Sequence, residues 1–248
     1  MVRAGINMQK DLIKKRFGKS LNSYENCAIV QKEMAKKLIE KLSYKFYDNI
    51  LEIGCGTGVL TKEIIKNIGF KNYIAVDIVS DCKNYINKIS DRINFTESDI
   101  EKYYPDYNQN LVISNASLQW VEDLPEIIKK INTYLSKNGE FVFTIFGKEN
   151  YREFSQFVES PLKYYDLKEL KEICKDFKII AIEDEIKMIE FDSPREVLHH
   201  IKNTGVNALS HTVWTKSDLV HFEESYPKNS NGNYCLTYHP IYVWLGKL

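Results

Sequence analysis

The sequence has little cysteine, and its cysteines stand far apart. Among 248 residues five are cysteine, and no two of them form a Cys-x-x-Cys pair. An odd number of widely spaced cysteines argues against a disulfide framework and against a zinc site. We therefore expect no metal centre. The five are Cys27, Cys55, Cys82, Cys174 and Cys235.

Long apolar runs are missing as well. No stretch approaches the roughly 18 consecutive apolar residues that a membrane span requires. Residues 1–17 are basic and polar, whereas a secretory leader would carry an apolar segment there. We expect a cytoplasmic protein without a membrane partner. Met8 is an alternative start to Met1, and no motif depends on which of the two is used.

Net charge is absent too, since 34 basic residues balance 34 acidic ones. A neutral chain is not expected to bind bulk DNA or RNA, because that requires a surplus of cations. The charge is unevenly spread: residues 1–46 hold 11 Lys and Arg against 4 Asp and Glu, a net +7, whereas residues 147–248 carry −3. The basic N-terminal segment is either a solvated helix face or a docking surface for an acidic partner.

Apolar and charged residues occur in the proportions of a globular protein, at 44% and 27%. Short apolar runs alternate with helical patterns, which is typical of a parallel sheet covered on both faces. Apolar residues between positions 28 and 42 recur at helical spacing and predict a helix. Strands are expected at residues 49–53, 72–77, 93–96, 111–115 and 140–146.

The pattern changes after residue 146. A helix is expected at residues 167–174, a strand at 178–186 and a last strand at 235–245. The intervening segment contains two helical stretches and is too long for an ordinary loop, so we interpret it as a cap. We predict four parts: an N-terminal helical lid at 1–46, a cofactor-binding core at 47–186, a helical cap at 187–234 and a final core strand at 235–248.

A glycine-rich turn stands between the first strand and a helix. Residues 50–58 read Ile-Leu-Glu-Ile-Gly-Cys-Gly-Thr-Gly. Glycines let the backbone turn sharply and approach a ligand closely, and the helix N-terminus offers N–H groups to that ligand. Position 59 is valine where a dinucleotide fingerprint needs glycine, and the Gly-Lys-Ser/Thr of a P-loop is missing. The turn therefore indicates a nucleotide-like ligand other than NAD or ATP.

Carboxylates lie beside this turn and at the ends of the next two strands. Asp77 ends the second strand, where a carboxylate can accept hydrogen bonds from both hydroxyls of a ribose. Asp99 follows the third strand and can bind an adenine amino group while Ile100 covers the ring; the alternative is a helix cap. Glu52 precedes the turn and is expected to orient it or to bind an amino group of the cofactor, the alternative being a partly exposed strand residue.

Together, the Glu-x-Gly-Cys-Gly-Thr-Gly turn, the acidic end of the second strand and the Ser-Asp-Ile after the third resemble the class I S-adenosylmethionine-dependent methyltransferases. The resemblance covers residues 46–146. It implies an α/β fold with a doubly wound, mostly parallel seven-stranded sheet of Rossmann-like type and a helical cap before the last strand. It also implies S-adenosylmethionine as cofactor and S-adenosylhomocysteine as product. The residues that it assigns to the cofactor are Glu52, Gly54, Cys55, Gly56, Gly58, Asp77, Ile78, Asp99, Ile100 and Asn115.

The flanks resemble a narrower family. Residues 16–24, Arg-Phe-Gly-Lys-Ser-Leu-Asn-Ser-Tyr, together with Ala28 and Gln31, resemble the entry segment of the malonyl-[acyl-carrier protein] O-methyltransferases of biotin synthesis. Residues 198–207 and 236–238 resemble that family's cap helix and final strand. The resemblance implies methylation of the free carboxylate of a malonyl thioester on acyl carrier protein or coenzyme A, which masks its charge so that fatty-acid elongation enzymes accept it.

A carboxylate is already ionised at pH 7, so its methylation needs no general base, only in-line approach and a site that excludes water. Tyr24 lies in an entry segment that we expect to be flexible and to close as a lid. Lys202 is either a substrate-binding residue or an ordinary surface charge. His199 and His200 are neighbours on a helix, so they point in different directions. The candidates for catalysis and substrate binding are Tyr24, Gln31, His200, Lys202 and Tyr238.

Other functions stay open. One is methylation of a small free acid, as in the trans-aconitate methyltransferases, which needs no basic docking face. Another is a non-catalytic module that only binds S-adenosylmethionine. Nucleic-acid methylation is disfavoured, because residues 115–118 lack the Asn-Pro-Pro-aromatic or Asp-Pro-Pro-aromatic stretch that holds a flipped base. Acyl carrier proteins are strongly acidic, so the basic N-terminal segment would steer such a partner to the enzyme.

Overall fold

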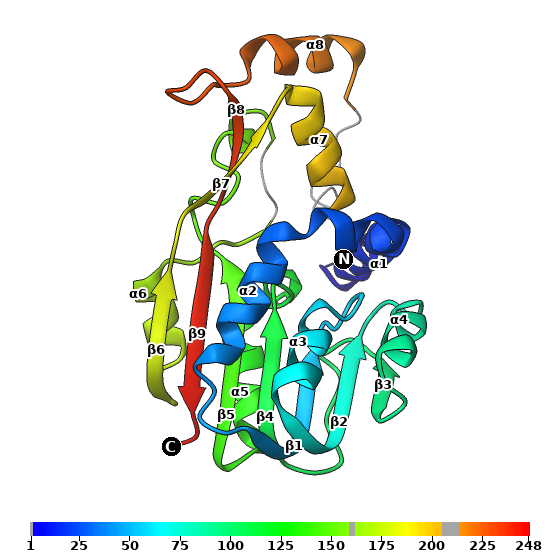
Figure 1. Ribbon diagram of the computed structural model, residues 1–248, viewed down its shortest axis with the longest axis vertical. Coiled ribbons are helices and arrows are strands. Elements are labelled where there is room, and N and C mark those ends of the chain that lie inside the picture. Colours follow the sequence, from blue (N-terminus) through cyan, green and yellow to red (C-terminus); the bar gives the residue numbers. More distant parts are fainter. Residues whose placement is uncertain (1, 159–161, 205–213) are drawn as a thin grey trace. The chain divides into compact units, whose positions relative to one another are not determined.

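The computed structural model describes residues 2–158, 162–204 and 214–248, with side chains from residue 10 onward (Figure 1). The chain divides into two compact units. The sheet unit comprises residues 29–148, 164–185 and 240–248. The cap unit comprises residues 1–28, 149–163 and 186–239.

Seven strands of the sheet unit pair in one sheet, in the order β3-β2-β1-β4-β5-β9-β6. The five strands from β3 to β5 run parallel, whereas β9 is antiparallel to both β5 and β6. Because the chain steps outward from β1 in both directions, the sheet is doubly wound, and the fold class expected from the sequence is confirmed. The strands are β1 Phe46–Ile53, β2 Gly69–Asp77, β3 Ile93–Glu97, β4 Gln109–Asn115, β5 Leu135–Phe146, β6 Lys178–Asp184 and β9 Pro240–Gly246.

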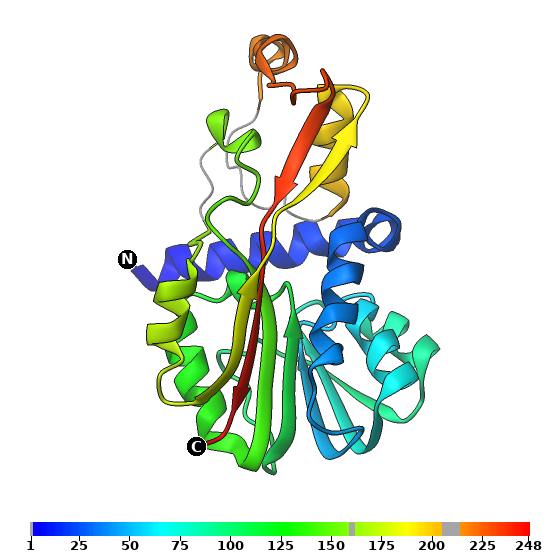
Figure 2. The same ribbon diagram turned by 60° about the vertical axis from the view of Figure 1, so that its left-hand side comes forward.

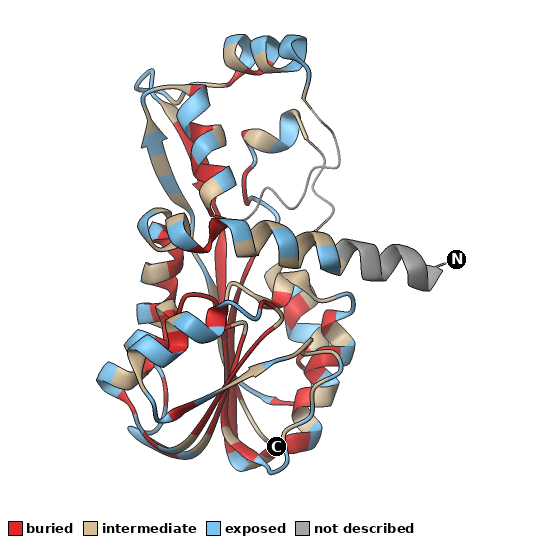
Figure 3. Ribbon diagram, turned by 90° about the vertical axis from the view of Figure 1, so that its right-hand side faces the viewer, coloured by how far each residue is buried: buried red, intermediate tan, exposed pale blue. Residues whose placement is uncertain are grey.

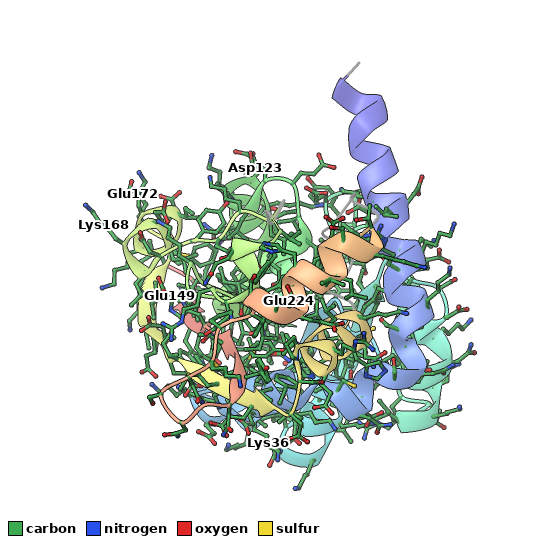
Figure 4. All side chains as sticks on the ribbon, turned by 90° about the horizontal axis from the view of Figure 1, so that it is seen from above. Lys36, Asp123, Glu149, Lys168, Glu172 and Glu224 are labelled. Carbon is green, nitrogen blue, oxygen red and sulfur yellow. The ribbon has the colours of Figure 1, made fainter. Side chains whose placement is uncertain are left out.

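Helices cover both faces of this sheet (Figure 2). Two of them, α5 and α6, lie on one face, and α2, α3 and α4 lie on the other. Each is amphipathic: α2 buries Met34, Ala35 and Leu38 and leaves Lys36 exposed. The Lys36 side chain projects away from the ribbon (Figure 4). The helices are α2 Ile29–Glu40, α3 Val59–Asn67, α4 Cys82–Ile89, α5 Leu124–Tyr134 and α6 Leu167–Ile173, with a 3₁₀ turn at Leu118–Trp120.

The strands form the buried centre of the sheet unit (Figure 3). Apolar side chains of β1, β4 and β5, such as Leu51, Val112 and Phe141, join one core cluster with the inner face of α5. The pairing register sets Ile53 of β1 beside Val76 of β2 and Ser114 of β4. The carboxyl ends of these three parallel strands therefore meet at one edge of the sheet, where ligands bind in folds of this type.

The cap unit combines helices with a two-stranded antiparallel ribbon of β7 and β8. The two helical stretches expected in the cap are confirmed as α7 and α8. A 3₁₀ turn at Phe154–Gln156 also belongs to this unit. Its regular elements are α1 Val2–Cys27, β7 Lys187–Phe191, α7 Pro194–Asn203, α8 Lys216–Ser225 and β8 Tyr234–Tyr238.

The single last strand predicted at residues 235–245 is wrong. β8 ends at Tyr238 and pairs with β7, whereas β9 begins at Pro240 and pairs with β5 and β6. Proline has no N–H to donate, so it suits the first position of a strand. A continuous apolar run hid this break, and the core strand assigned to residues 235–248 starts at residue 240.

The predicted lid and core boundaries also need correction. Within the segment 1–46, α2 belongs to the sheet unit, because its apolar stripe is buried there. Residues 149–163, placed in the core by the sequence analysis, belong to the cap unit. The entry segment expected to be flexible is part of α1. Between positions 10 and 27 this helix buries Ser20 and Leu21, whereas the other side chains there are half-buried or exposed. Its apolar pattern is therefore weak.

Candidate cofactor and substrate sites

The glycine turn after β1 has backbone that only glycine adopts readily. Gly54, Gly56 and Gly58 have φ of 69°, 52° and 82°. A Cβ added at Gly54 would lie 1.9 Å from the Ser117 Oγ, and one at Gly58 would lie 2.2 Å from the Ile89 Cδ1. Glycine is therefore required in this turn for two reasons: the backbone has positive φ, and neighbouring side chains leave no room for a Cβ.

Hydrogen bonds fasten this turn to the end of β2. The main-chain N–H groups of Gly54 and Cys55 both donate to the Val76 carbonyl, at 2.8 and 3.2 Å. Gly58 stands at the N-terminus of α3, and no side chain caps that helix. The first-turn N–H groups of α3 are thus left for a ligand or water.

Asp77 lies beside the turn, at the end of β2, and is 7% exposed. Its Oδ2 accepts the Gly56 N–H at 2.8 Å, its Oδ1 accepts the Val79 N–H at 2.9 Å, and the Cys82 thiol also donates to the carboxylate. Burial raises the pKa of Asp77, and these donors act in the opposite direction. The carboxylate is held in a fixed orientation at the edge where the three strand ends meet.

Glu52 is buried beneath the turn, at 1% exposure, so the alternative of a partly exposed strand residue is wrong. Its Oε2 accepts hydrogen bonds from the Thr61 hydroxyl at 2.7 Å and the Tyr73 hydroxyl at 2.5 Å. Burial raises the pKa of Glu52 to about 7, although both hydroxyl donors lower it. Glu52 thus ties β1, α3 and β2 together directly under the glycine turn.

The raised pKa of Glu52 predicts a pH effect on stability. The folded protein binds this proton more tightly than the unfolded chain, so the associated stability is fully present below the ordinary pKa of about 4.5 and is lost as pH rises through about 7. Between pH 5 and 8 we expect the wild type to lose on the order of 1–3 kcal/mol more unfolding free energy than Glu52→Gln. Urea unfolding at both pH values measures this, with Glu126→Gln as the exposed control. Equal pH slopes in wild type and Glu52→Gln would refute the assignment.

Asp99 begins a short turn after β3. Its Oδ1 accepts the Glu101 N–H at 3.0 Å, and its carbonyl accepts the N–H groups of Lys102 and Tyr103 at 2.9 and 3.0 Å. Asp99 thus caps a turn, and because no helix lies between β3 and β4 the alternative of a helix cap is wrong. Ile100 packs against the core cluster of the sheet, and Ile78 directly follows Asp77 with intermediate exposure. Contacts of Asp99, Ile100 and Ile78 with adenosine stay predictions.

Asn115, at the end of β4, is fixed from two sides. Its Oδ1 accepts the Thr144 hydroxyl at 2.7 Å, and its Nδ2 donates to the Gln31 carbonyl at 2.9 Å. The next residue, Ala116, has φ of 49°, and its N–H donates to the Thr144 carbonyl at 3.1 Å and the Thr144 hydroxyl at 2.9 Å. A left-handed alanine held in this way is strained backbone of the kind found at functional sites.

Of the buried polar atoms of the sheet unit that have no hydrogen-bond partner among the described residues, three belong to residues at the glycine turn or next to Asn115. They are the Gln31 Oε1, the Glu52 Oε1 and the Thr57 Oγ. Buried polar atoms are nearly always paired, so unpaired ones suggest a missing ligand or water. Thr57 belongs to the glycine turn, Glu52 lies under it, and Gln31 contacts Asn115 through its carbonyl. This set, with the glycine cradle and Asp77, fits a nucleoside ligand that carries an ammonium group.

The structure brings together two of the predicted substrate residues in the cap unit. The His200 Nε2 lies 2.6 Å from the Tyr238 hydroxyl, which also accepts the Tyr151 hydroxyl at 3.1 Å. Burial, aided by the charge of His199, lowers the pKa of His200 to about 4, so His200 is neutral at pH 7. Tyr151 was missed by the sequence analysis, because a single tyrosine outside any motif gives no signal; its φ of 58° marks it in the structure.

Of the remaining substrate candidates, Tyr24 lies close enough to Tyr238 that, besides burial, it helps to raise the pKa of that hydroxyl. His199 is exposed while His200 is buried, as their adjacency on α7 predicted. Lys202 is exposed, which agrees with the alternative of a surface charge. Tyr24 packs against Phe17 in α1, with ring centroids 5.2 Å apart. Gln31 belongs to the sheet unit rather than the cap unit.

Nowhere in the described part do three or more His, Cys, Asp and Glu side chains gather as metal ligands would. None of the described helices combines the length and apolarity needed to cross a bilayer.

The strand order, the glycine turn and the carboxylate at the end of β2 define a class I S-adenosylmethionine-dependent methyltransferase. A family model described as a methyltransferase domain matches residues 19–178. Among curated proteins, the malonyl-[acyl-carrier protein] O-methyltransferase of Calditerrivibrio nitroreducens is 37% identical over 239 residues, covering 94% of this chain and 96% of the relative. The chain belongs to the malonyl-[acyl-carrier protein] O-methyltransferase family.

Other comparisons agree. The enzyme of the same name from Bacteroides thetaiotaomicron is 31% identical over 257 residues, covering 95% of this chain and 97% of the relative. Among solved structures, the YcgJ protein of Bacillus subtilis matches with a TM-score of 0.60 at 13% identity over 87% of this chain and 98% of that one. The N-methyltransferase NodS of Bradyrhizobium japonicum, in complex with S-adenosylhomocysteine, matches with a TM-score of 0.53 at 12% identity over 91% and 98%. These structures show the fold. The chain is an enzyme, an O-methyltransferase that uses S-adenosylmethionine.

Proposed function

We propose that this enzyme methylates the free carboxylate of a malonyl thioester on acyl carrier protein, at the start of the pimeloyl branch of biotin synthesis. The observation that carries the proposal is similarity to relatives of that name over nearly the whole chain. It extends beyond the cofactor core, and substrate specificity in methyltransferases resides in the segments outside that core. A cytoplasmic location is part of the proposal.

The sheet unit would hold the cofactor. In this proposal the glycine turn receives the methionine end, Asp77 binds the ribose, Asp99 and Ile100 bind adenine, and Asn115 faces the reacting methyl group. The fixed Asp77 carboxylate and the unpaired Gln31 Oε1 support it. S-adenosylmethionine supplies an electrophilic sulfonium methyl, which an ionised carboxylate can accept without help from a general base.

The cap unit would orient the substrate carboxylate. His200 is neutral at pH 7, so together with the hydroxyls of Tyr151 and Tyr238 it offers hydrogen bonds without a positive charge. A neutral set suits this reaction, because an ammonium held against the carboxylate would weaken it as a nucleophile. Tyr24 completes the proposed set of substrate residues, whereas the exposed ammonium of Lys202 does not fit a neutral set and Gln31 lies in the sheet unit.

The basic face of α1 provides a test of the carrier-protein partner. Lys15 and Lys19 are exposed on α1, within the segment of net charge +7. We expect Lys15→Glu/Lys19→Glu to raise the KM for malonyl-acyl carrier protein about tenfold at low salt and to leave the KM for malonyl-coenzyme A unchanged. Steady-state kinetics at two ionic strengths measure both KM values, with Lys168→Glu, an exposed position on α6 outside that segment, as the control. If the KM for malonyl-acyl carrier protein changes neither with salt nor with the charge reversal, the basic residues of α1 form a solvated helix face and not a docking surface.

A substrate panel tests the proposal as a whole. The purified enzyme is given S-adenosylmethionine with malonyl-acyl carrier protein, malonyl-coenzyme A or trans-aconitate, and kcat/KM is compared. We expect the highest kcat/KM for malonyl-acyl carrier protein. A higher kcat/KM for trans-aconitate would contradict the proposal and identify the enzyme as a methyltransferase of small free acids. Cofactor binding without turnover of any acid would favour a non-catalytic module that only binds S-adenosylmethionine.

A further inference from the structure

Lys130 of α5 reaches the turn that follows β3. Its Nζ donates to the carbonyls of Ile100 and Glu101, at 2.9 Å each. The same ammonium lies 3.9 Å from the centroid of the Tyr104 ring. Two carbonyls and an aromatic face therefore surround one half-buried cation.

The turn has a specific need for these donors. Asp99 opens it by accepting the Glu101 N–H on its side chain and the N–H groups of Lys102 and Tyr103 on its carbonyl. The last carbonyls of a helical turn have no N–H donors within the turn. Lys130 supplies charged donors to two of them, so it fixes the end of the turn opposite to Asp99.

A second link joins the turn to the segment before α5. The Glu101 Oε1 accepts the main-chain N–H of Glu122 at 2.9 Å. The turn is therefore linked at two points: Glu101 bonds to the loop before α5, and Lys130 bonds to the turn from the middle of α5. Both links are charge-assisted, because the Lys130 ammonium donates in one and the Glu101 carboxylate accepts in the other, and Lys130 makes two such hydrogen bonds against one.

We propose that Lys130 is a positioning residue for the adenine end of the cofactor site: its ammonium holds the Ile100 and Glu101 carbonyls and thereby sets the Asp99 carboxylate and the Ile100 side chain against the base. The inference rests on the proposed adenine role of Asp99 and Ile100. Lys130 does not itself contact the cofactor, and it has no part in methyl transfer.

Binding of S-adenosylhomocysteine, adenosine and purine riboside tests the inference, because purine riboside lacks the adenine amino group. Lys130→Met removes the charge and keeps most of the length of the side chain. We expect it to weaken S-adenosylhomocysteine about tenfold and to reduce the preference for adenosine over purine riboside. Lys130→Arg keeps the charge and should retain most of the affinity. The kcat at saturating cofactor should stay within about twofold of wild type, so the defect falls on KM.

Lys129→Met is the matched control, since Lys129 is the neighbour on α5 and its exposed side chain forms an ion pair with Glu126. Affinity in Lys130→Met equal to that of Lys129→Met would overturn the inference. An equal loss for adenosine and purine riboside would overturn it as well, because it would indicate a general structural defect. Calorimetry needs no acyl substrate, so a wild type that binds S-adenosylhomocysteine but ignores malonyl-acyl carrier protein would refute the proposed substrate and leave this inference standing.

Discussion

Replacing Gly54 by alanine is expected to weaken S-adenosylhomocysteine binding by at least about a hundredfold. Two costs combine at this position. Alanine is strained at a φ of 69°, and its Cβ would lie 1.9 Å from the Ser117 Oγ and 2.4 Å from the Ser117 Cβ. The Ser117 Oγ can rotate away, but its Cβ is fixed to the backbone, so the turn or the segment at Ser117 must shift. Isothermal calorimetry measures the loss.

Two further variants separate crowding from backbone strain. Gly232 has a φ of 83° with nothing within 4 Å of an added Cβ, so Gly232→Ala carries the strain alone, and we expect it to bind the cofactor product normally. Adding Ser117→Gly to Gly54→Ala removes the clash and should restore part of the affinity. Affinity within threefold of wild type in Gly54→Ala would contradict the placement of the cofactor at this turn.

Replacing Asp77 by asparagine is expected to cost about a hundredfold in affinity for S-adenosylhomocysteine. The carboxylate uses one oxygen for the Gly56 N–H and the other for the Val79 N–H. An asparagine has one acceptor oxygen, so its NH₂ group faces one of those donors, and it cannot accept hydrogen bonds from two ribose hydroxyls as a carboxylate does. The variant should lose both the fixed turn and the ribose acceptor.

The control for this variant is Asp81→Asn, an exposed carboxylate at the start of α4 that makes no capping hydrogen bond. It should bind the cofactor product as the wild type does. Thermal unfolding of Asp77→Asn shows whether the loss is local. An Asp77→Asn protein that keeps wild-type affinity would show that Asp77 only supports the turn and does not bind the ribose.

The sheet and its cofactor edge could be predicted from the sequence because their signals are local. Short apolar runs gave strands β1 to β5, and the glycine turn between a strand and a helix stood out at residues 54–58. Glycine at positive φ and carboxylates at strand ends follow from the backbone geometry of such a fold. The same reasoning places Asp77 at the end of β2, where its carboxylate accepts the Gly56 and Val79 N–H groups.

The cap could be predicted less well, because its contacts join segments far apart in the chain. The link from Tyr151 to Tyr238 spans 87 residues, and the link from His200 to Tyr238 spans 38. No periodic pattern marks such pairs. The break at Pro240 was missed for a different reason: β8 and β9 are both apolar and nearly contiguous, and only their pairing partners distinguish them. Lys130 gave no sequence signal, since one lysine among several on α5 looks like a surface charge.

The most direct test of the central claim locates the transferred methyl group. The enzyme is incubated with malonyl-acyl carrier protein and S-adenosylmethionine that carries an isotopic label in its methyl group. The acyl group is then released from the thioester and analysed by mass spectrometry. The account predicts the label in a base-labile methyl ester on the distal carboxylate of the malonyl group, and much less of it from the Asp77→Asn protein at a limiting concentration of S-adenosylmethionine. Label on the carrier protein itself, or an unlabelled malonyl group despite cofactor binding, would contradict it.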